Sequence, residues 1–471
     1  MVFSRGRSFR PLTNIRITNK IKMNQAEQEI IEEKEVAQVK EQNRIQELSD
    51  EQPFGKERMK KVGFDLLAFL RSLIMAVLLG IGVGVYACAF AMLINFLTGV
   101  RAQTPWLLYL LPVGGLAIVG FYHLLKADDP KGTNRVLESI SSEDETLPIK
   151  MTPLITVGTS ITHLFGGSAG REGAALQIGG SIGANFARVL KLSKTEVMIM
   201  TMCGMSAAFS AMFGTPLTAT IFAMEVVSIG ILHYSAIVPC AVSALVAGLM
   251  GRLIGYVPET YPQVSFPSFT ILNGLSTLAL GILCAALSVV FCIILHKTEH
   301  YLKKFLRNQY LRTVVGGALV IGITLLLGTR DYNGAGGPLI EQALKGNAVW
   351  YSFLIKMILT AITLGACYKG GEIIPTIFVG ATFGCVAAPL LGLPAATGAA
   401  LGICGVFCGV TNCPLASIAL CFELFGISGL PLFLIVAAVS FRLSGYYSLY
   451  TGQKIMYSKS HPLLINRKTW K

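Results

Sequence analysis

The sequence predicts an all-α membrane protein with many spans, and two observations support this. The chain has 471 residues, of which 53% are hydrophobic and 14% charged, whereas soluble domains carry about 25% charged residues. The charges are also uneven, because residues 1–61 are crowded with them and long later stretches have almost none. Only helices or closed barrels satisfy their backbone in lipid, and the sequence lacks the strict two-residue alternation of a barrel.

Six apolar stretches are long enough, or nearly so, to cross a hydrocarbon core about 30 Å thick. They are Leu66–Val100, Pro105–Leu125, Val197–Gly230, Ile231–Met250, Ile271–Leu295 and Val314–Gly328. We therefore predict a transmembrane helix bundle over residues 62–455. Residues 1–61 are expected to form a charged cytoplasmic segment, and residues 456–471 a short cytoplasmic tail.

The net charge of +13 would suit a nucleic-acid partner, but its distribution argues against one. The positive residues cluster in short loops between apolar stretches: Arg188, Lys191, Lys194, Lys297, Lys303, Lys304, Arg307, Arg312, Lys454, Lys459, Arg467 and Lys471. Such an excess marks cytoplasmic loops. We expect a multi-pass protein of the cell membrane with both termini in the cytoplasm. No apolar run follows the basic residues 1–22, so they are not a secretory signal, and Met23 is an alternative start.

The eleven cysteines lie nearly all inside apolar stretches. No pair of them has metal-ligand spacing with supporting histidines or carboxylates, and thiols inside a membrane argue against a disulfide framework. We expect them to be small packing residues and predict neither a metal nor another cofactor.

The second half of the chain repeats landmarks of the first. The matching landmarks are Cys203-Gly204 and Cys404-Gly405, Pro216-Leu217 and Pro414-Leu415, Glu225 and Glu423, and glycine-rich loops that carry Glu172 and Glu372. Chance similarity in a Gly/Ala/Leu-rich chain is the alternative. The common order favours two halves, about 62–255 and 270–455, which would be inverted repeats with a binding site near the membrane midplane.

The stretch Gly166–Gly173 combines a glycine break with Arg171 and Glu172, and helical spacing resumes after it. A helix that begins there presents unpaired N–H groups and a positive dipole, which attract an anion. A glutamate in the first turn can occupy the anion site and leave it when protonated, which couples an anion to a proton. A structural ion pair between Arg171 and Glu172 is the alternative.

Three further stretches have polar or glycine-rich breaks. Lys369–Pro375 is a second glycine break before a helix start, with Pro375 suited to the first turn. Gly132–Val136 is a polar break, and Gly445–Tyr450 is rich in tyrosine. A tyrosine hydroxyl that points inward can donate to an anion, whereas an interfacial aromatic belt is the more common role.

These motifs together resemble the CLC family of chloride channels and proton-coupled anion exchangers. The resemblance lies in Gly170-Arg171-Glu172-Gly173, then Gly371-Glu372 with Pro375, then a late tyrosine, and it covers about residues 63–455. It implies an inverted-repeat transporter bundle with partly re-entrant helices, a pathway within each subunit, and a homodimer in the lipid bilayer.

The resemblance also implies roles for individual residues. Glu172 resembles the gating glutamate, and Glu372 is the second candidate for proton coupling. The implied anion-binding set is Thr133, Asn134, Arg171, Gly173, Ile373, Ile374, Phe378 and Tyr450, to which Ile373, Ile374 and Phe378 contribute backbone N–H groups.

Several positions depart from the chloride-type pattern. Gly132–Val136 reads Gly-Thr-Asn-Arg-Val in place of Gly-Ser-Gly-Ile-Pro, Ala174 replaces a proline, and Val226 replaces an inner proton-relay glutamate. These changes, with Gly-Gly-Glu in the second motif, resemble the fluoride-exporting branch. Ile374 stands where that branch often has threonine. Arg135 is unexpected beside a pore, although it can extend toward the cytoplasm.

We predict a transporter of chloride, fluoride or both, operating as a proton-coupled antiporter, with a passive CLC-type chloride channel as the alternative. Two other classes fit less well. A membrane-embedded hydrolase using Glu172, Glu372 and His163 would need paired acids or metal ligands at one site, so we predict no enzyme. A cation or metabolite carrier would need inward acidic residues without positive helix ends.

Overall fold

The computed structural model describes residues 56–127, 132–141, 146–461 and 463–469, with side chains from residue 66 onward. The predictions for residues 1–55, including Met23, lie outside this part. The contacts divide the chain between Arg71 and Ser72, and the packing described below belongs to the unit that begins at Ser72.

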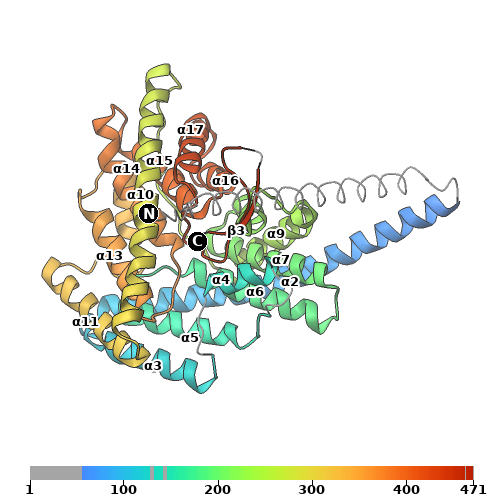
Figure 1. Ribbon diagram of the computed structural model, residues 1–471, viewed down its shortest axis with the longest axis horizontal. Coiled ribbons are helices and arrows are strands. Elements are labelled where there is room, and N and C mark those ends of the chain that lie inside the picture. The colour runs from blue at the N-terminus through green and yellow to red at the C-terminus, as the bar shows by residue number, and fades with distance from the viewer. Residues whose placement is uncertain (1–55, 128–131, 142–145, 462, 470–471) are drawn as a thin grey trace, which may run out of the picture. The chain divides into compact units, whose positions relative to one another are not determined.

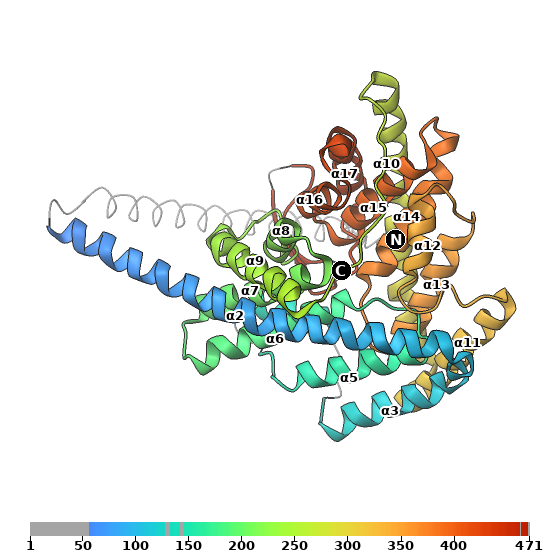
Figure 2. The same ribbon diagram turned by 180° about the vertical axis from the view of Figure 1, so that it is seen from behind.

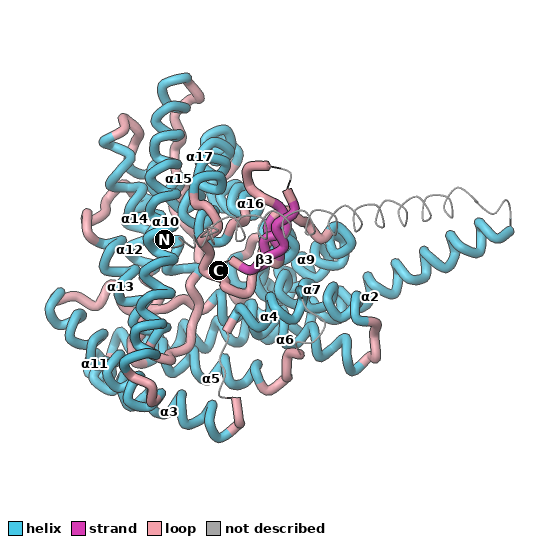
Figure 3. Tube along the Cα trace, in the orientation of Figure 1, coloured by secondary structure: helices cyan, strands magenta, loops and turns pink. Residues whose placement is uncertain are grey.

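Helices make up most of the described structure (Figure 1; Figure 3). The α-helices are α2 (Lys56–Gln103), α3 (Leu111–Leu124), α4 (Thr133–Ser141), α5 (Met151–Leu164), α6 (Glu172–Val189), α7 (Lys194–Phe213), α8 (Pro216–Glu225), α9 (Ile237–Ile254), α10 (Ile271–Phe305), α11 (Gln309–Leu327), α12 (Gly337–Leu344), α13 (Ser352–Gly365), α14 (Ile373–Leu390), α15 (Ala395–Thr411), α16 (Pro414–Phe425) and α17 (Leu430–Leu443). Three short 3₁₀ helices are η1 (Pro105–Leu110), η2 (Tyr234–Ala236) and η3 (Ile427–Gly429). The strands are β1 (Ser228–Ile229), β2 (Lys454–Tyr457) and β3 (Leu464–Lys468).

Seven helical segments of the described residues are long and apolar enough to cross a membrane, which confirms the predicted polytopic bundle. One predicted boundary is wrong. The stretch Val197–Gly230 is two helices, α7 and α8, because Gly214 takes a left-handed φ of 71° and Pro216 then opens a new helix. A left-handed residue ends a helix, and proline favours the first position of the next one.

The two halves pack their central helices in the same way, as expected for inverted repeats. In the first half, a Cβ on Gly179 of α6 would lie 2.2 Å from the Gly204 oxygen of α7. In the second half, a Cβ on Gly380 of α14 would lie 2.5 Å from the Gly402 oxygen of α15. Both helix pairs therefore approach at glycines, where no side chain separates the backbones. Figures 1 and 2 show α6 beside α7 and α14 beside α15 from both sides.

The landmarks Glu225 and Glu423 cap each other's helix. Glu423 at the end of α16 accepts the backbone N–H groups of Leu217 and Thr218 at the start of α8, at 2.9 and 2.8 Å. Glu225 at the end of α8 accepts those of Leu415 and Ala416 at the start of α16, at 3.1 and 2.8 Å. A carboxylate at a helix N-terminus satisfies amides that have no partner within the helix. The repeat seen in the sequence is thus a pair of reciprocal caps between the halves.

The described part of the C-terminal tail is folded against the bundle. Strand β2 pairs in parallel with β1 and antiparallel with β3. Lys468 forms an ion pair with Glu138 of α4 at 2.5 Å, and the Thr469 hydroxyl donates to the Tyr450 carbonyl at 2.7 Å. The tail therefore contacts two segments that the sequence analysis assigned to the anion site.

Candidate ion pathway

The loop before α6 is shaped by its glycines. Helix α5 ends at Leu164, Gly166 takes a φ of +85°, and the Gly167 amide donates to the Thr162 carbonyl at 2.9 Å. This is the Schellman arrangement, in which a left-handed residue terminates a helix and turns the chain sharply. The turn lets a new helix, α6, begin at Glu172 in the protein interior.

The loops that precede α6 and α14 pair directly with each other. Gly170 and Gly371 exchange two backbone hydrogen bonds, with N···O distances of 2.8 and 2.7 Å. A Cβ on Gly371 would lie 2.5 Å from the Gly173 nitrogen, closer than real Cβ atoms approach a neighbour. Glycine at position 371 therefore allows the N-termini of α6 and α14 to meet.

The paired helix starts provide several backbone donors in one place. The amides of Gly173 and Ala174 lie in the first turn of α6, and those of Ile373 and Ile374 lie in the first turn of α14. First-turn amides have no acceptor within their own helix, and the helix dipole adds positive potential. This arrangement suits a small anion.

Glu172 is held by protein groups. Its side chain is buried, the Oε2 atom accepts the Arg171 backbone N–H at 3.0 Å, and the Oε1 atom lies 3.5 Å from the Arg171 Nε atom. Arg171 in turn donates its Nη2 group to Glu259 at 3.0 Å and its Nη1 group to Asn95. The carboxylate thus lies at the N-terminus of α6, the positive end of the helix dipole.

The Glu372 side chain has fewer protein partners than that of Glu172. Its Oε2 atom is buried and has no hydrogen-bond partner among the described residues. The hydroxyl of Tyr450, a residue only 1% exposed, likewise has no partner there. Both residues line one cavity. Buried polar atoms are normally satisfied, so these two are available to a transported ion, a proton or water.

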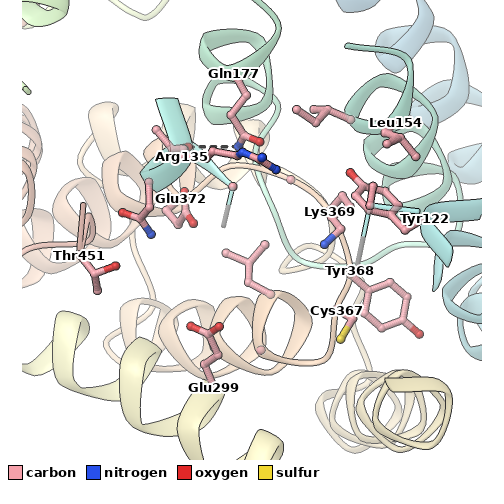
Figure 4. A pocket seen from close by; sticks show the side chains of 18 of the residues that line it. Tyr122, Arg135, Leu154, Gln177, Glu299, Cys367, Tyr368, Lys369, Glu372 and Thr451 are labelled. Carbon is pink, nitrogen blue, oxygen red and sulfur yellow. Dashed lines mark hydrogen bonds between the residues drawn. The ribbon is translucent and has the colours of Figure 1, made fainter. Parts of the chain in front are cut away.

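This cavity, which we call the basic cavity, has a volume of about 1180 Å³. Its charged lining residues are Lys126, Arg135, Lys150, Lys303, Arg307, Arg312 and Lys369 against Glu138, Glu299 and Glu372. Figure 4 shows Arg135, Gln177 and Glu372 lining it from different elements, with Glu299 entering from α10. The excess of positive charge attracts small anions into the cavity.

Four of the predicted residues come together at this cavity: Thr133, Asn134, Glu372 and Tyr450. The Thr133 hydroxyl accepts from Gln177 of α6 at 3.1 Å. The Asn134 side-chain oxygen accepts the Gly452 amide at 2.9 Å. Because each of these polar groups is fixed by a neighbour, the segment Gly132–Val136 has a defined position at the cavity wall.

The remaining predicted residues lie elsewhere. Gly173, Ile373 and Ile374 are at the paired helix starts, as described. Arg171 lines a second cavity of about 600 Å³, and its guanidinium is occupied by protein acceptors. Phe378 lies in the second turn of α14, where amides bond within the helix; its ring packs against Lys356, whose Nζ atom is 5.2 Å from the ring centroid.

Two residues at the basic cavity were not assigned a site role from the sequence. Gln177 lies one helical turn after Gly173, so both occupy the same face of α6, and this spacing was the available signal. Lys369 precedes the Gly370-Gly371 break directly, and its Nζ atom lies 4.6 Å from the centre of the Tyr122 ring. The position of the Tyr122 ring depends on tertiary packing, and no local pattern indicated it.

The three residues of the hydrolase alternative, Glu172, Glu372 and His163, do not line one common cavity. His163 and Arg171 line the second cavity, whereas Glu372 lines the basic cavity. Among the described residues no three His, Cys, Asp or Glu side chains are grouped so that they could hold a metal ion. The two carboxylates lie instead at the starts of two helices from opposite halves.

Inverted halves whose helix starts meet beside buried carboxylates define a membrane transporter of the anion-conducting type. Comparison with protein-family models gives the particular family. The model described as voltage gated chloride channel matches residues 114–445, and the chain belongs to this family, the CLC proteins.

Known relatives agree with this assignment. The chain is 34% identical to a chloride/fluoride channel protein of Pseudomonas syringae pv. tomato over 404 residues, which are 84% of this chain and 89% of the relative. It is 26% identical over 418 residues to the H(+)/Cl(-) exchange transporter ClcA of Yersinia pestis, covering 82% and 86% of the two chains.

Solved structures show the same fold. A crystal structure of a CLC-type fluoride/proton antiporter superposes with a TM-score of 0.79 at 31% identity, covering 83% of this chain and 99% of that one. A slow cyanobacterial Cl-/H+ antiporter has a TM-score of 0.68 at 20% identity, covering 79% and 94%. The inverted-repeat bundle predicted from the sequence is thus confirmed.

Proposed function

We propose that this protein is a proton-coupled halide antiporter that exchanges fluoride, and less readily chloride, for protons. One observation carries the proposal: Glu172 and Glu372 lie at the starts of α6 and α14, whose loops pair at Gly170 and Gly371. An anion and a carboxylate compete for the same positive helix ends. The similarity to a fluoride/proton antiporter supports the preference for fluoride.

In the proposed cycle, Glu172 is the outer gate. It occupies the anion position over α6 while ionised and withdraws when protonated, and the anion then takes its place. Glu372 receives the proton on the side of the basic cavity, because its Oε2 atom has no partner there. The Tyr450 hydroxyl and the first-turn amides of α14 hold the anion meanwhile. Val226 has no ionisable side chain, so Glu372 takes the role of the inner proton-relay residue.

The orientation follows from the charges. We place the basic cavity and both termini on the cytoplasmic side of the cell membrane, because cytoplasmic loops carry the excess of lysine and arginine. The second cavity then faces outward. Cysteine labelling of intact cells at Lys345, an exposed residue after α12, tests this; protection from an impermeant reagent at that site contradicts the orientation.

We also propose a homodimer. Leu217 and Leu415 occupy matching positions at the starts of the mutually capped helices α8 and α16, and both are about half exposed. Paired apolar surfaces of this kind suit a two-fold interface within lipid. Single-molecule photobleaching of labelled protein in vesicles should show two steps, and a single step contradicts the dimer.

The decisive experiment is an assay in reconstituted vesicles with an interior pH probe. A fluoride gradient should drive protons against their own gradient, and chloride should do so more slowly. Halide flux without proton movement contradicts the exchanger and indicates the alternative, a passive channel. Movement of neither halide contradicts both.

A further inference from the structure

Tyr450 is held at the basic cavity by a segment without regular secondary structure. Helix α17 ends at Leu443 and strand β2 begins at Lys454, and the residues between them form no helix or strand. Tyr450 is nevertheless only 1% exposed, and its hydroxyl has no hydrogen-bond partner among the described residues. Figure 4 shows the next residue, Thr451, at the wall of this cavity. The position of Tyr450 must therefore come from bonds made by its backbone.

Gln453 is fully buried and uses its whole side-chain amide. Its Nε2 atom donates to the carbonyl oxygens of Thr411 and Val226, at 2.8 and 3.0 Å. Its Oε1 atom accepts from the Ser448 hydroxyl at 2.9 Å and from the Asn412 side-chain nitrogen at 3.2 Å. A carboxamide has two N–H donors and an oxygen with two lone pairs, so these four bonds satisfy the side chain completely.

The two carbonyl groups that Gln453 binds belong to opposite halves of the chain. Val226 directly follows α8 in the first half, and Thr411 is the last residue of α15 in the second half. Carbonyl groups at the end of a helix have no N–H partner within that helix. Gln453 satisfies one such group at each of the two helix ends and is thereby anchored to both halves.

The anchored glutamine fixes the backbone on both sides of Tyr450. The Ser448 hydroxyl, which donates to Gln453, accepts the Tyr450 N–H at 3.1 Å. The Gln453 N–H donates to the Tyr450 carbonyl at 3.2 Å. The tail adds a second link, because the Thr469 N–H donates to the Gln453 carbonyl at 3.0 Å and the Thr469 hydroxyl donates to the Tyr450 carbonyl at 2.7 Å. Both backbone polar groups of Tyr450 are thus tied to Gln453 or to a residue that Gln453 binds.

The backbone position matters because the Tyr450 hydroxyl can hold an anion only at hydrogen-bond distance. A hydroxyl donor and its acceptor lie about 2.5–3.0 Å apart, and a misplacement of about 1 Å can cost about a hundredfold in rate. Gln453 lines neither of the two cavities. It does not touch an ion there, so any effect that it has on the ion must pass through another residue.

We propose that Gln453 is a positioning residue of the inner anion site. Its bonds to the ends of α8 and α15 hold the backbone of Tyr450 so that the tyrosine hydroxyl reaches an anion in the basic cavity. This inference rests on the proposed function, in which that hydroxyl holds the transported halide.

The test measures the fluoride concentration at half-maximal flux, with the full chain in vesicles. Gln453→Met keeps a side chain of similar length and removes its hydrogen bonds. We expect the half-maximal concentration to rise about tenfold, with a smaller change in the maximal rate, because the hydroxyl no longer meets the anion. An unchanged half-maximal concentration overturns the proposal.

A double variant separates positioning from a general loss of structure. Tyr450→Phe removes the hydroxyl through which Gln453 is proposed to act. In that background Gln453→Met should raise the half-maximal concentration by less than about twofold more, because two changes that act through one group are not additive. An equal rise in both backgrounds, or an unchanged value in Tyr450→Phe alone, overturns the proposal.

Ser448→Ala gives the same test with a milder change, and it decides the matter if Gln453→Met does not fold. It removes only the hydroxyl between Gln453 and the Tyr450 N–H, and we expect a rise of about threefold that disappears in the Tyr450→Phe background. The matched control, Ser288→Ala in α10, removes another fully buried hydroxyl that binds backbone carbonyls. It should leave the value within about twofold of the wild type. A rise of equal size in the control, or none in Ser448→Ala, overturns the proposal.

These measurements do not depend on proton coupling. If the wild type moves fluoride without protons, the antiporter proposal fails, and the half-maximal concentrations still decide the role of Gln453. If no halide moves, calorimetric titration of the purified wild type and variants with fluoride gives dissociation constants in their place. A rise of about tenfold in Gln453→Met then supports the positioning role, and equal constants, or no binding by the wild type, overturn it.

Discussion

The two helix junctions at the centre of the molecule have the same backbone plan and differ in their side chains. In the first half, α5 ends with a left-handed Gly166 and α6 begins at Glu172; in the second, α13 ends with a left-handed Cys367 and Glu372 precedes α14. Glu172 is bound by Arg171, whereas the Glu372 Oε2 atom has no partner among the described residues.

The residue before each glutamate explains the difference. Arg171 directly precedes Glu172 and fixes its carboxylate, while Gly371 directly precedes Glu372 and has no side chain to do so. Gly371 is required there because it contacts Gly173 of the opposite half. Because the two halves approach closely at Gly371, this position cannot carry a side chain such as that of Arg171. Glu372 therefore lacks the side-chain partner that Glu172 has. The proposed cycle assigns the gate to the held carboxylate, Glu172, and the inner proton role to Glu372, whose Oε2 atom has no partner among the described residues.

The largest expected effect is at the held carboxylate. Glu172→Ala should abolish the coupling of fluoride to protons, because the group that competes with the anion and carries the proton is gone. The vesicle assay with a pH probe measures this. The matched control, Glu196→Gln, changes a partly exposed carboxylate of a capping box at the start of α7 and should leave coupling intact. Full coupling in Glu172→Ala removes this residue from the proposed role.

Glu372→Gln tests the free carboxylate. The substitution keeps the shape and removes the charge, so we expect transport to slow about tenfold or more while stability changes little, because the Oε2 atom has no partner to lose. Vesicle flux and thermal unfolding in detergent give the two readouts. A large loss of stability with unchanged transport would show that Glu372 is structural. It would contradict the description of Glu372 as the carboxylate that is less tightly held than Glu172.

Gly371→Ala tests the contact that links the junctions. The added Cβ would lie 2.5 and 2.8 Å from the Gly173 nitrogen and Cα atoms, and backbone atoms in two packed helices cannot move aside cheaply. We expect a loss of about 1–3 kcal/mol in the free energy of unfolding together with lost transport. Gly82→Ala is the control, since nothing lies within 4 Å of its added Cβ. Equal stability of the two variants contradicts the packing described.

The sequence predicted the junctions better than the residues around them. Glycine breaks, the acidic pair and the repeated Pro-Leu and glutamate landmarks are local patterns, and local patterns determine where helices start. The roles of Gln177 and Lys369, and the occupied guanidinium of Arg171, depend on elements far apart in the chain. The break at Gly214 was missed because the boundary was taken from average hydropathy, although Gly214 and Pro216 are a local signal for the end of one helix and the start of the next.

The reciprocal caps extend the comparison to the next pair of helices. Glu423 accepts three hydrogen bonds from Leu217 and Thr218, including the Thr218 hydroxyl at 2.6 Å, whereas Glu225 accepts two. We expect Glu423→Ala to lower the free energy of unfolding by about 1–2 kcal/mol and Glu225→Ala by somewhat less. Thermal unfolding of both variants in detergent shows which substitution lowers the stability more. A larger effect at Glu225 would show that hydrogen-bond number does not determine the cost.

The smallest expected effect concerns the left-handed residues themselves. Cys367 has a φ of +74°, which a residue with a Cβ adopts at a cost of about 1–2 kcal/mol, and its sulfur accepts from Arg312 at 2.9 and 3.1 Å. Cys367→Gly relieves the strain but loses this contact and gains chain entropy when unfolded, so stability should change by less than about 1 kcal/mol.

Gly166→Ala, the matched change at the first junction, introduces that strain and places a Cβ 3.2 Å from Asn333 and Leu108 side-chain atoms. It should destabilise the protein by about 1–2 kcal/mol. Thermal unfolding of the two variants compares them directly. If Cys367→Gly is the more damaging change, the contact between Arg312 and Cys367 stabilises the second junction more than the left-handed backbone strains it. The two junctions would then differ in what holds the backbone as well as in what holds the carboxylate.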